Sequence, residues 1–72
     1  MGPQSTYVKT EVVGTSSKSI SDAIDHTIAT AGKTLRNLDW FEVVDMRGAI
    51  KDNKVSHYQV TIKLGLRYEP KG

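Results

Sequence analysis

The stretch LDWFEVVDMRG, from Leu38 to Gly48, contains the only tryptophan of the chain beside its only phenylalanine. Its aromatic and β-branched residues predict that it forms a strand. The apolar positions in it are first odd-numbered, at Phe41 and Val43, and then even-numbered, at Met46. Because neighbouring side chains of a strand point to opposite faces, this change of parity requires an irregularity in the strand.

A bulge of one residue near Val44 and Asp45 accounts for the change, since an extra residue reverses the faces of all the side chains that follow it. With this bulge, four apolar residues share the face that we expect a helix to cover: Phe41, Val43, Met46 and Ile50. The opposite, open face then carries Trp40, Glu42, Asp45 and Arg47.

Alternating residues predict two further strands. The clearest pattern follows a turn at KDNK, residues 51–54, whose composition is typical of a hairpin. One face of this strand carries Tyr58, Val60, Ile62, Leu64 and Leu66, and the other carries His57, Gln59, Thr61, Lys63 and Arg67. The segment TYVKTEVVG alternates in the same way near the start of the chain, and we expect this first strand to end at Gly14.

An amphipathic helix is predicted between the first two strands, from about Ser19 to Leu38. Its apolar residues recur at spacings of three and four, as on one face of a helix: Ile20, Ala23, Ile24, Ile28, Ala31, Leu35 and Leu38. Ser19 and Asp22 resemble a capping box at its start. Lys33 and Arg36 lie near its expected end, where positive charge stabilises the helix dipole.

The predicted fold class is therefore α+β, with the order strand–helix–strand–strand and a three-stranded antiparallel sheet wrapped on one amphipathic helix. The helix reverses the chain, so the first and second strands run in the same direction. Placing the third strand between them makes every pairing antiparallel. One helix cannot cover three strands, so we expect part of the sheet to meet other subunits or a ligand.

Length and composition limit the function further. We expect the 72 residues to form a single domain, residues 1–72, with a frayed start at residues 1–6. A chain this short buries a small core, and without cysteine it has no disulfide to add stability, so we expect it to oligomerise. The absence of cysteine also fits a reducing compartment, the cytoplasm.

Several classes of partner are not expected. The two histidines fall on different predicted elements, which argues against a metal site. A net charge of +2 lacks the dense basic clusters of a nucleic-acid-binding protein. No apolar run approaches the length of a membrane span.

Trp40 and Gln59 are the open-face residues best suited to a planar ligand. An indole offers a π-face on which a heterocycle stacks. The amide of Gln59 offers a donor and an acceptor together, which matches the imide edge of a ring. The alternatives are a rim tryptophan that packs against Phe41 or a neighbouring subunit, and a solvated strand glutamine.

Arg47 and Arg67 suit a phosphate group, because a guanidinium binds two of its oxygens at once. The alternative for both is a surface ion pair with Glu42, Asp45 or Glu69. The GTSS segment, residues 14–17, suits either anion binding or capping of the helix. Nucleophile, base and orienting acid do not occur in a pattern that indicates catalysis, so no enzymatic activity is expected.

The chain resembles the dodecin family from Tyr7 to about Glu69. The resemblance lies in VVGTSS, TLRNLDWFEV, the RG pair at residues 47–48, YQVTIKLG and LRYE, in this order and spacing. It implies a small flavin-binding protein of the bacterial type, with the strand–helix–strand–strand arrangement and a hollow homododecameric assembly. Members of the family are regarded as flavin stores or buffers that quench the bound flavin.

The resemblance also implies roles for four residues. Trp40 stacks on the isoalloxazine ring, so that paired flavins lie between tryptophans of two subunits, and Gln59 hydrogen-bonds the polar edge of the ring. Arg47 is assigned to the flavin phosphate or a neighbouring acid. Arg67 is assigned to phosphates of flavin or of coenzyme A, which some members also bind. The bacterial-type pattern favours FMN over riboflavin or FAD.

Two other functions remain open at this point. One is a module for coenzyme A, nucleotides or nucleic acid, which would use Lys9, Lys63, Arg47 and Arg67 with Trp40. The acidic residues on the same face argue against it. The other is a small enzyme completed at subunit interfaces, although flavin held between stacking partners leaves no room for a substrate.

Overall fold

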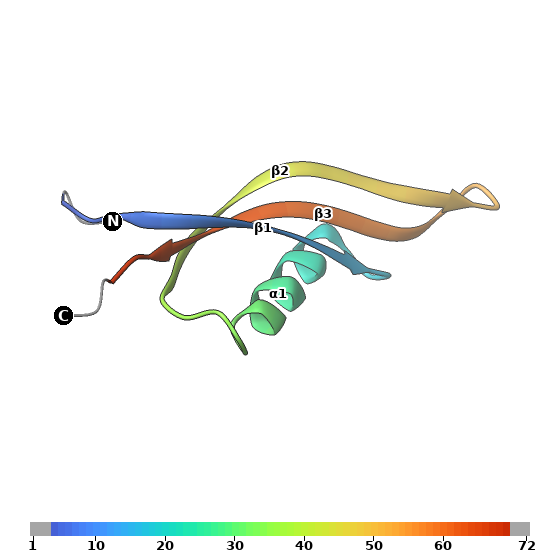
Figure 1. Cartoon of the computed structure of the whole chain (residues 1–72). Helices are drawn as coiled ribbons and strands as arrows, with labels where there is room; N and C mark the ends of the chain where they lie inside the picture. Colours follow the sequence, from blue (N-terminus) through green and yellow to red (C-terminus); the bar gives the residue numbers. More distant parts are fainter. Residues whose placement is uncertain (1–3, 70–72) are drawn as a thin grey trace.

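The computed structural model describes residues 4–69, in which one helix lies along one face of a three-stranded sheet (Figure 1). The elements are β1 (Tyr7–Ser16), α1 (Ile20–Ala31), β2 (Leu38–Lys51) and β3 (Lys54–Arg67). β3 lies between β1 and β2 and is antiparallel to both. The predicted α+β class and the predicted strand order are therefore confirmed.

The segment between β1 and α1 caps the helix. The hydroxyl of Ser19 accepts a hydrogen bond from the backbone N–H of Asp22 (3.0 Å), as in an N-cap. The Asp22 carboxylate accepts a hydrogen bond from the Ser16 hydroxyl (2.6 Å), whose oxygen accepts one from the Lys18 N–H (2.9 Å). The expectation that the first strand ends at Gly14 is wrong, because β1 continues to Ser16 before this capping network begins.

The predicted end of the helix at Leu38 is also wrong. The helix ends at Ala31, where the N–H groups of Lys33 and Thr34 donate to carbonyls only three residues back (both 3.2 Å). Asn37, with a φ of 62°, then leads the chain into β2. Leu35 and Leu38 nevertheless pack against the core from outside the helix, so their spacing only imitates a continued helical stripe. Lys33 and Arg36 consequently follow the helix, whose last turn has no basic residue.

The bulge at Val44 is present. Val43 pairs with Ile62 and Asp45 with Thr61, which leaves Val44 as the extra residue of β2. The KDNK turn is confirmed as well, with positive φ at both central residues. Two further register shifts were not predicted, one between residues 38 and 40 and one between residues 49 and 50.

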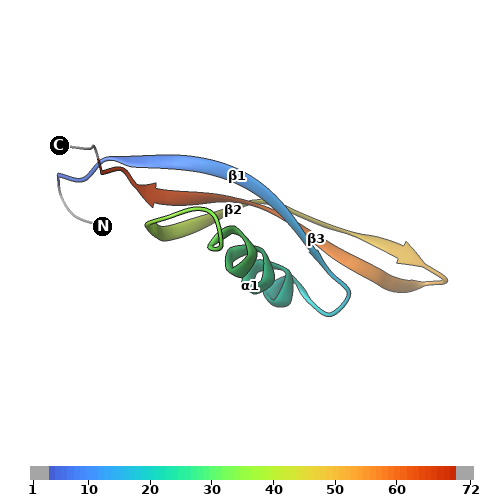
Figure 2. The ribbon, with the colours of Figure 1, turned by 60° about the horizontal axis from the view of Figure 1, so that its bottom comes forward.

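The core lies between α1 and the middle of β3. The side chains at its centre, all at most 1% exposed, are Ala23, Val60, Ile62 and Leu64. The helix packs on β1 and β3, and the β2–β3 hairpin extends beyond it (Figure 2). The pairing of β2 with β3 places four apolar residues of β2 on the helix side of the sheet: Phe41, Val43, Met46 and Ile50. Their side chains nevertheless remain 42–79% exposed. One helix thus leaves much of the sheet uncovered, as predicted.

The start of the described chain is held to the end of β3. The carbonyl of Thr6 accepts a hydrogen bond from the N–H of Tyr68 (2.8 Å). Of the six residues expected to be frayed, residues 1–3 lie outside the described part of the chain.

Gly14 allows β1 to approach the helix closely. A Cβ atom at this position would lie 1.5 Å from the hydroxyl oxygen of Thr27. Thr27 is buried, and its hydroxyl donates a hydrogen bond to the carbonyl of Ala23 (2.6 Å). Since Thr27 is fixed by this bond, the strand–helix contact depends on a residue without a side chain at position 14.

We therefore expect Gly14→Ala to lower the free energy of unfolding by about 1–3 kcal/mol, the usual cost of overpacking. Urea unfolding at a fixed protomer concentration measures it. Gly32→Ala is the matched control, because φ there is −64° and the nearest atom would lie 3.3 Å away. An unchanged midpoint for Gly14→Ala would contradict the close approach.

Candidate functional site

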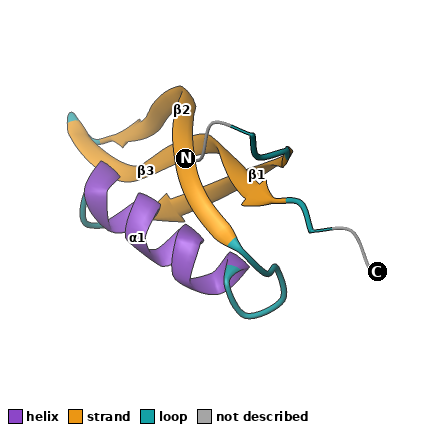
Figure 3. Ribbon diagram, turned by 90° about the vertical axis from the view of Figure 1, so that its left-hand side faces the viewer, coloured by secondary structure: helices purple, strands orange, loops and turns teal. Residues whose placement is uncertain are grey.

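The candidate site lies on the face of the sheet away from α1. Figure 3 views the ribbon from one end, with the helix against the other face. The pairing of the strands places the following polar and aromatic residues on this open face: Tyr7, Lys9, Glu11, Trp40, Glu42, Asp45, Arg47, Gln59, Lys63 and Arg67. The four residues proposed from sequence as ligand contacts therefore share one face, as the Val44 bulge predicts.

Trp40 lies across the central strand. It pairs with Gly65 of β3, and a Cβ atom on Gly65 would lie 2.1 Å from Cε2 of the indole. The indole thus occupies the space that a side chain at position 65 would need. Its Nε1 atom is buried and has no hydrogen-bond partner among residues 4–69.

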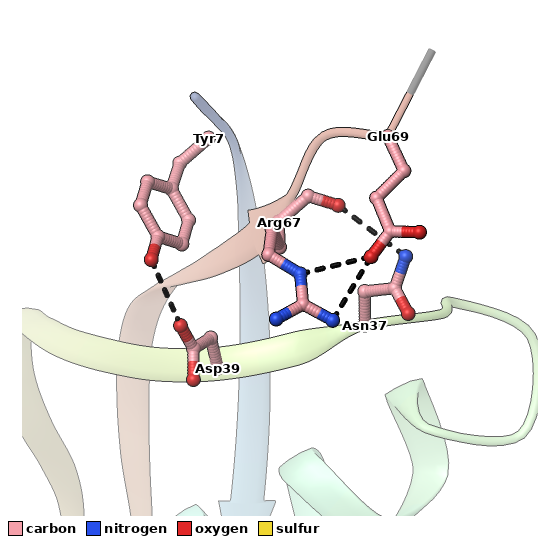
Figure 4. A network of polar contacts seen from close by, with 5 residues as sticks. All are labelled: Tyr7, Asn37, Asp39, Arg67 and Glu69. Carbon is pink, nitrogen blue, oxygen red and sulfur yellow. Dashed lines mark hydrogen bonds and ion pairs between the residues drawn. The ribbon is translucent and has the colours of Figure 1, made fainter. Parts of the chain in front are cut away.

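Tyr7 supports Trp40 from the neighbouring strand. The two rings meet edge to face, with centroids 6.2 Å apart and an interplanar angle of 62°. The Tyr7 hydroxyl donates a hydrogen bond to Oδ2 of Asp39 (3.1 Å), the residue before Trp40 (Figure 4). This pair ties β1 to β2 across β3. Tyr7 was not predicted as a site residue, although strand alternation places it on the same face as Lys9.

Lys9 lies beside this aromatic pair. Its ammonium lies over the Trp40 ring, 5.4 Å from the centroid, and forms an ion pair with Glu42. The hydrogen bond from Lys9 lowers the pKa of the Glu42 carboxyl. Desolvation opposes this effect, and the charges of Lys9 and Lys63 lower the pKa further. Glu42 is therefore ionised at neutral pH and holds the Lys9 ammonium near the indole.

Arg47 and Arg67 form surface ion pairs with carboxylates, the alternative to phosphate binding that the sequence left open. Arg47 Nε donates a hydrogen bond to Oδ2 of Asp45 (2.8 Å). Arg67 binds Oε1 of Glu69 through Nε and Nη2 (both 2.9 Å; Figure 4). All four side chains are about half exposed, and exposed ion pairs contribute little stability. An incoming phosphate can therefore replace either carboxylate at small cost.

The site residues fall into two groups along β3. Arg47 is the direct partner of Gln59, whereas Trp40 pairs with Gly65, six residues further along the same strand. At about 3.3 Å per residue, this separation is about 20 Å. The bulge places the tryptophan, the amide and both guanidinium groups on one face, as predicted, but within one protomer it leaves Trp40 and Gln59 at separate positions along the strand.

Residues 4–69 offer little for other classes of site. Within them, His, Cys, Asp and Glu side chains do not gather in a group of three that could hold a metal ion. In the same part of the chain, the 12-residue α1 is too short to cross a membrane.

Comparison with known proteins gives a consistent match over most of the chain. The dodecin family model matches residues 6–69. The dodecin of Thermus thermophilus is 49% identical over 63 residues, which cover 88% of this chain and 91% of that protein. The solved structure of dodecin from Streptomyces coelicolor has 47% identity and a TM-score of 0.87, covering 97% of this chain and 100% of the other.

Other solved neighbours are variants of the Thermus thermophilus dodecin. In one a tryptophan is replaced by phenylalanine, and in two others an arginine is replaced by alanine; each has 45% identity to this chain and a TM-score of 0.85–0.87. The three replaced positions are spaced by seven and then twenty residues, as are Trp40, Arg47 and Arg67 here. With the fold, the family model and these relatives in agreement, the chain belongs to the dodecin family.

Proposed function

We propose that the protein is a cytoplasmic store or buffer for flavin, with FMN favoured, and that it binds flavin in stacked pairs within a closed homododecamer. One observation carries the proposal. The open face presents Trp40, held by Tyr7, at one end of β3, and Gln59 with Arg47 six residues away along this strand. At about 3.3 Å per residue, the two groups are about 20 Å apart. One small ligand cannot contact both groups in a single protomer. A site that uses both is completed by a second subunit.

Trp40 is the stacking residue of this site. Its ring is held by Gly65 beneath it and by Tyr7 at its edge, so little side-chain entropy remains to be lost when a flat ligand binds. Two such indoles from two subunits would enclose a pair of isoalloxazine rings. An electron-rich indole in contact with an excited flavin donates an electron, which quenches the flavin emission.

Gln59 and Arg47 recognise the polar parts of the ligand. The Gln59 amide offers a donor and an acceptor to the imide edge of the ring. Arg47, its partner in the register, exchanges Asp45 for the flavin phosphate, which favours FMN over riboflavin. Arg67 exchanges Glu69 for a phosphate of flavin or of coenzyme A, the second expected ligand.

The ion pairs of the open face argue against the rival module for nucleic acid. Three of its basic residues, Lys9, Arg47 and Arg67, are already matched by carboxylates. A single flavin phosphate exchanges only one of these carboxylates, whereas a nucleic-acid backbone would have to exchange all three. A non-enzymatic flavin store needs no catalytic group.

Assembly is supported by the exposed apolar surface on the helix side of the hairpin. A hollow of about 340 Å³ there is lined by Ile20, Met46, Ile50, Val55 and Tyr58, among others. Ile50 is 79% exposed in the protomer. A surface of this kind is typical of contacts between subunits, and in the proposed assembly other subunits cover it.

The first test concerns Trp40. We expect Trp40→Ala to weaken flavin binding by about 1–3 kcal/mol, the usual worth of one stacking contact, or about fivefold to more than a hundredfold. A titration followed by flavin emission measures it, with oligomer size checked separately. Trp40→Phe is the control: it keeps a stacking ring but donates electrons poorly, so it should bind flavin with less quenching. Equal binding and quenching by Trp40→Ala and the parent would rule Trp40 out.

The second test concerns Gln59. Gln59→Ala removes a donor and an acceptor from a buried contact, so flavin affinity should fall by about 1–3 kcal/mol while the oligomer stays intact. His57→Ala is the matched control, since His57 is an exposed neighbour on the same strand. If both variants bind flavin like the parent, Gln59 is a solvated strand residue.

The third test concerns assembly. Light scattering should give a mass of twelve protomers of 8.0 kDa, with little folded monomer at micromolar concentration. Ile50→Asp places a charge on the uncovered apolar surface and should shift the protein toward smaller species. Lys51→Asp, a change at its exposed neighbour, should not. A folded monomer of the parent chain would refute the closed assembly.

A further inference from the structure

Lys9 reaches across the whole sheet. It pairs with Gly65 in the register, and Gly65 in turn pairs with Trp40, so the three residues form one row across β1, β3 and β2. The Lys9 ammonium lies 5.4 Å from the centre of the indole and is bound to Glu42, in the next row of the open face. The side chain therefore crosses above the central strand and over the aromatic ring.

Three neighbours limit the surface of the indole that a flat ligand can reach: Gly65, Tyr7 and Lys9. Gly65 lies directly beneath it, at the position where a Cβ atom would come within 2.1 Å of the ring. Tyr7 meets the ring at its edge. The ammonium of Lys9 lies over the ring. A planar ligand and Lys9 therefore compete for the same indole surface.

We propose that Lys9 is a gate on the stacking face of Trp40, held closed by Glu42 and displaced when flavin binds. This inference rests on the proposed function. The gate opens easily, because both side chains of the Lys9–Glu42 pair are about half exposed (49% and 47%) and exposed pairs are weak. It also keeps the indole covered when no ligand is present, which protects an otherwise exposed aromatic surface.

Glu42 acts only through Lys9 in this scheme. The lowered pKa of its carboxyl keeps it ionised at neutral pH, so the ammonium stays near the ring. Neutralising Glu42 should loosen the gate without removing it. Lys63 provides the comparison: it is the direct register partner of Glu42 and faces the same side, but Lys9 is the residue that lies over Trp40.

The test is a titration of the full-length oligomer with riboflavin, followed by flavin emission. Riboflavin has no phosphate, so a change of protein charge does not act on the ligand directly. Lys9→Ala should tighten binding about two- to fivefold, the equivalent of one exposed cation–π contact. Glu42→Gln should tighten it less, and the double variant should match Lys9→Ala alone. Lys63→Ala should leave the affinity unchanged.

Unchanged or weaker riboflavin binding by Lys9→Ala would overturn the gate, and so would additive effects of Lys9→Ala and Glu42→Gln. A ligand-free measurement tests the same contact: acrylamide should quench the emission of Trp40, the only tryptophan, more strongly in Lys9→Ala than in Lys63→Ala. Equal quenching would also overturn it. If the parent binds no riboflavin and no FMN, the proposed function fails together with the gate; if the parent binds and Lys9→Ala does not differ, the gate alone fails.

Discussion

The alternation of side chains along β3 is the constraint on which the rest of the molecule depends. As the central strand, β3 has one face packed on the helix and the other open. Its even-numbered residues, Val60, Ile62 and Leu64, form the centre of the core. Its odd-numbered residues face the open side, where the candidate site lies. They include Gln59 and Gly65, which lies beneath Trp40. A shift of one residue would exchange the core and the candidate site.

The same strand explains why the protomer is incomplete. A single 12-residue helix covers β1 and β3, and the apolar side chains of β2 stay exposed beside it. On the other face, Trp40 and Gln59 lie at distant points of β3. Under the proposed function, further subunits bury the apolar surface on one face and complete the binding site on the other.

Much of this could be predicted from the sequence, because strand alternation is a local signal. It indicated the strand order, the faces of Trp40 and Gln59, and the bulge at Val44. The end of the helix was missed because Leu35 and Leu38 continue its spacing and pack on the core, although the helix has already ended at Ala31. The supports of the tryptophan, Tyr7 and Lys9, were not identified as such because cross-strand neighbours depend on the register, and the shift between residues 38 and 40 decides it.

The central claim, that the open face binds flavin by stacking on Trp40, is tested most directly by the spectrum of the purified protein after incubation with FMN and removal of the free ligand. The account predicts a flavin absorption band that stays with the oligomer and an emission far below that of the same concentration of free FMN. Absence of a retained flavin band, or a retained flavin that fluoresces like free FMN, would contradict it.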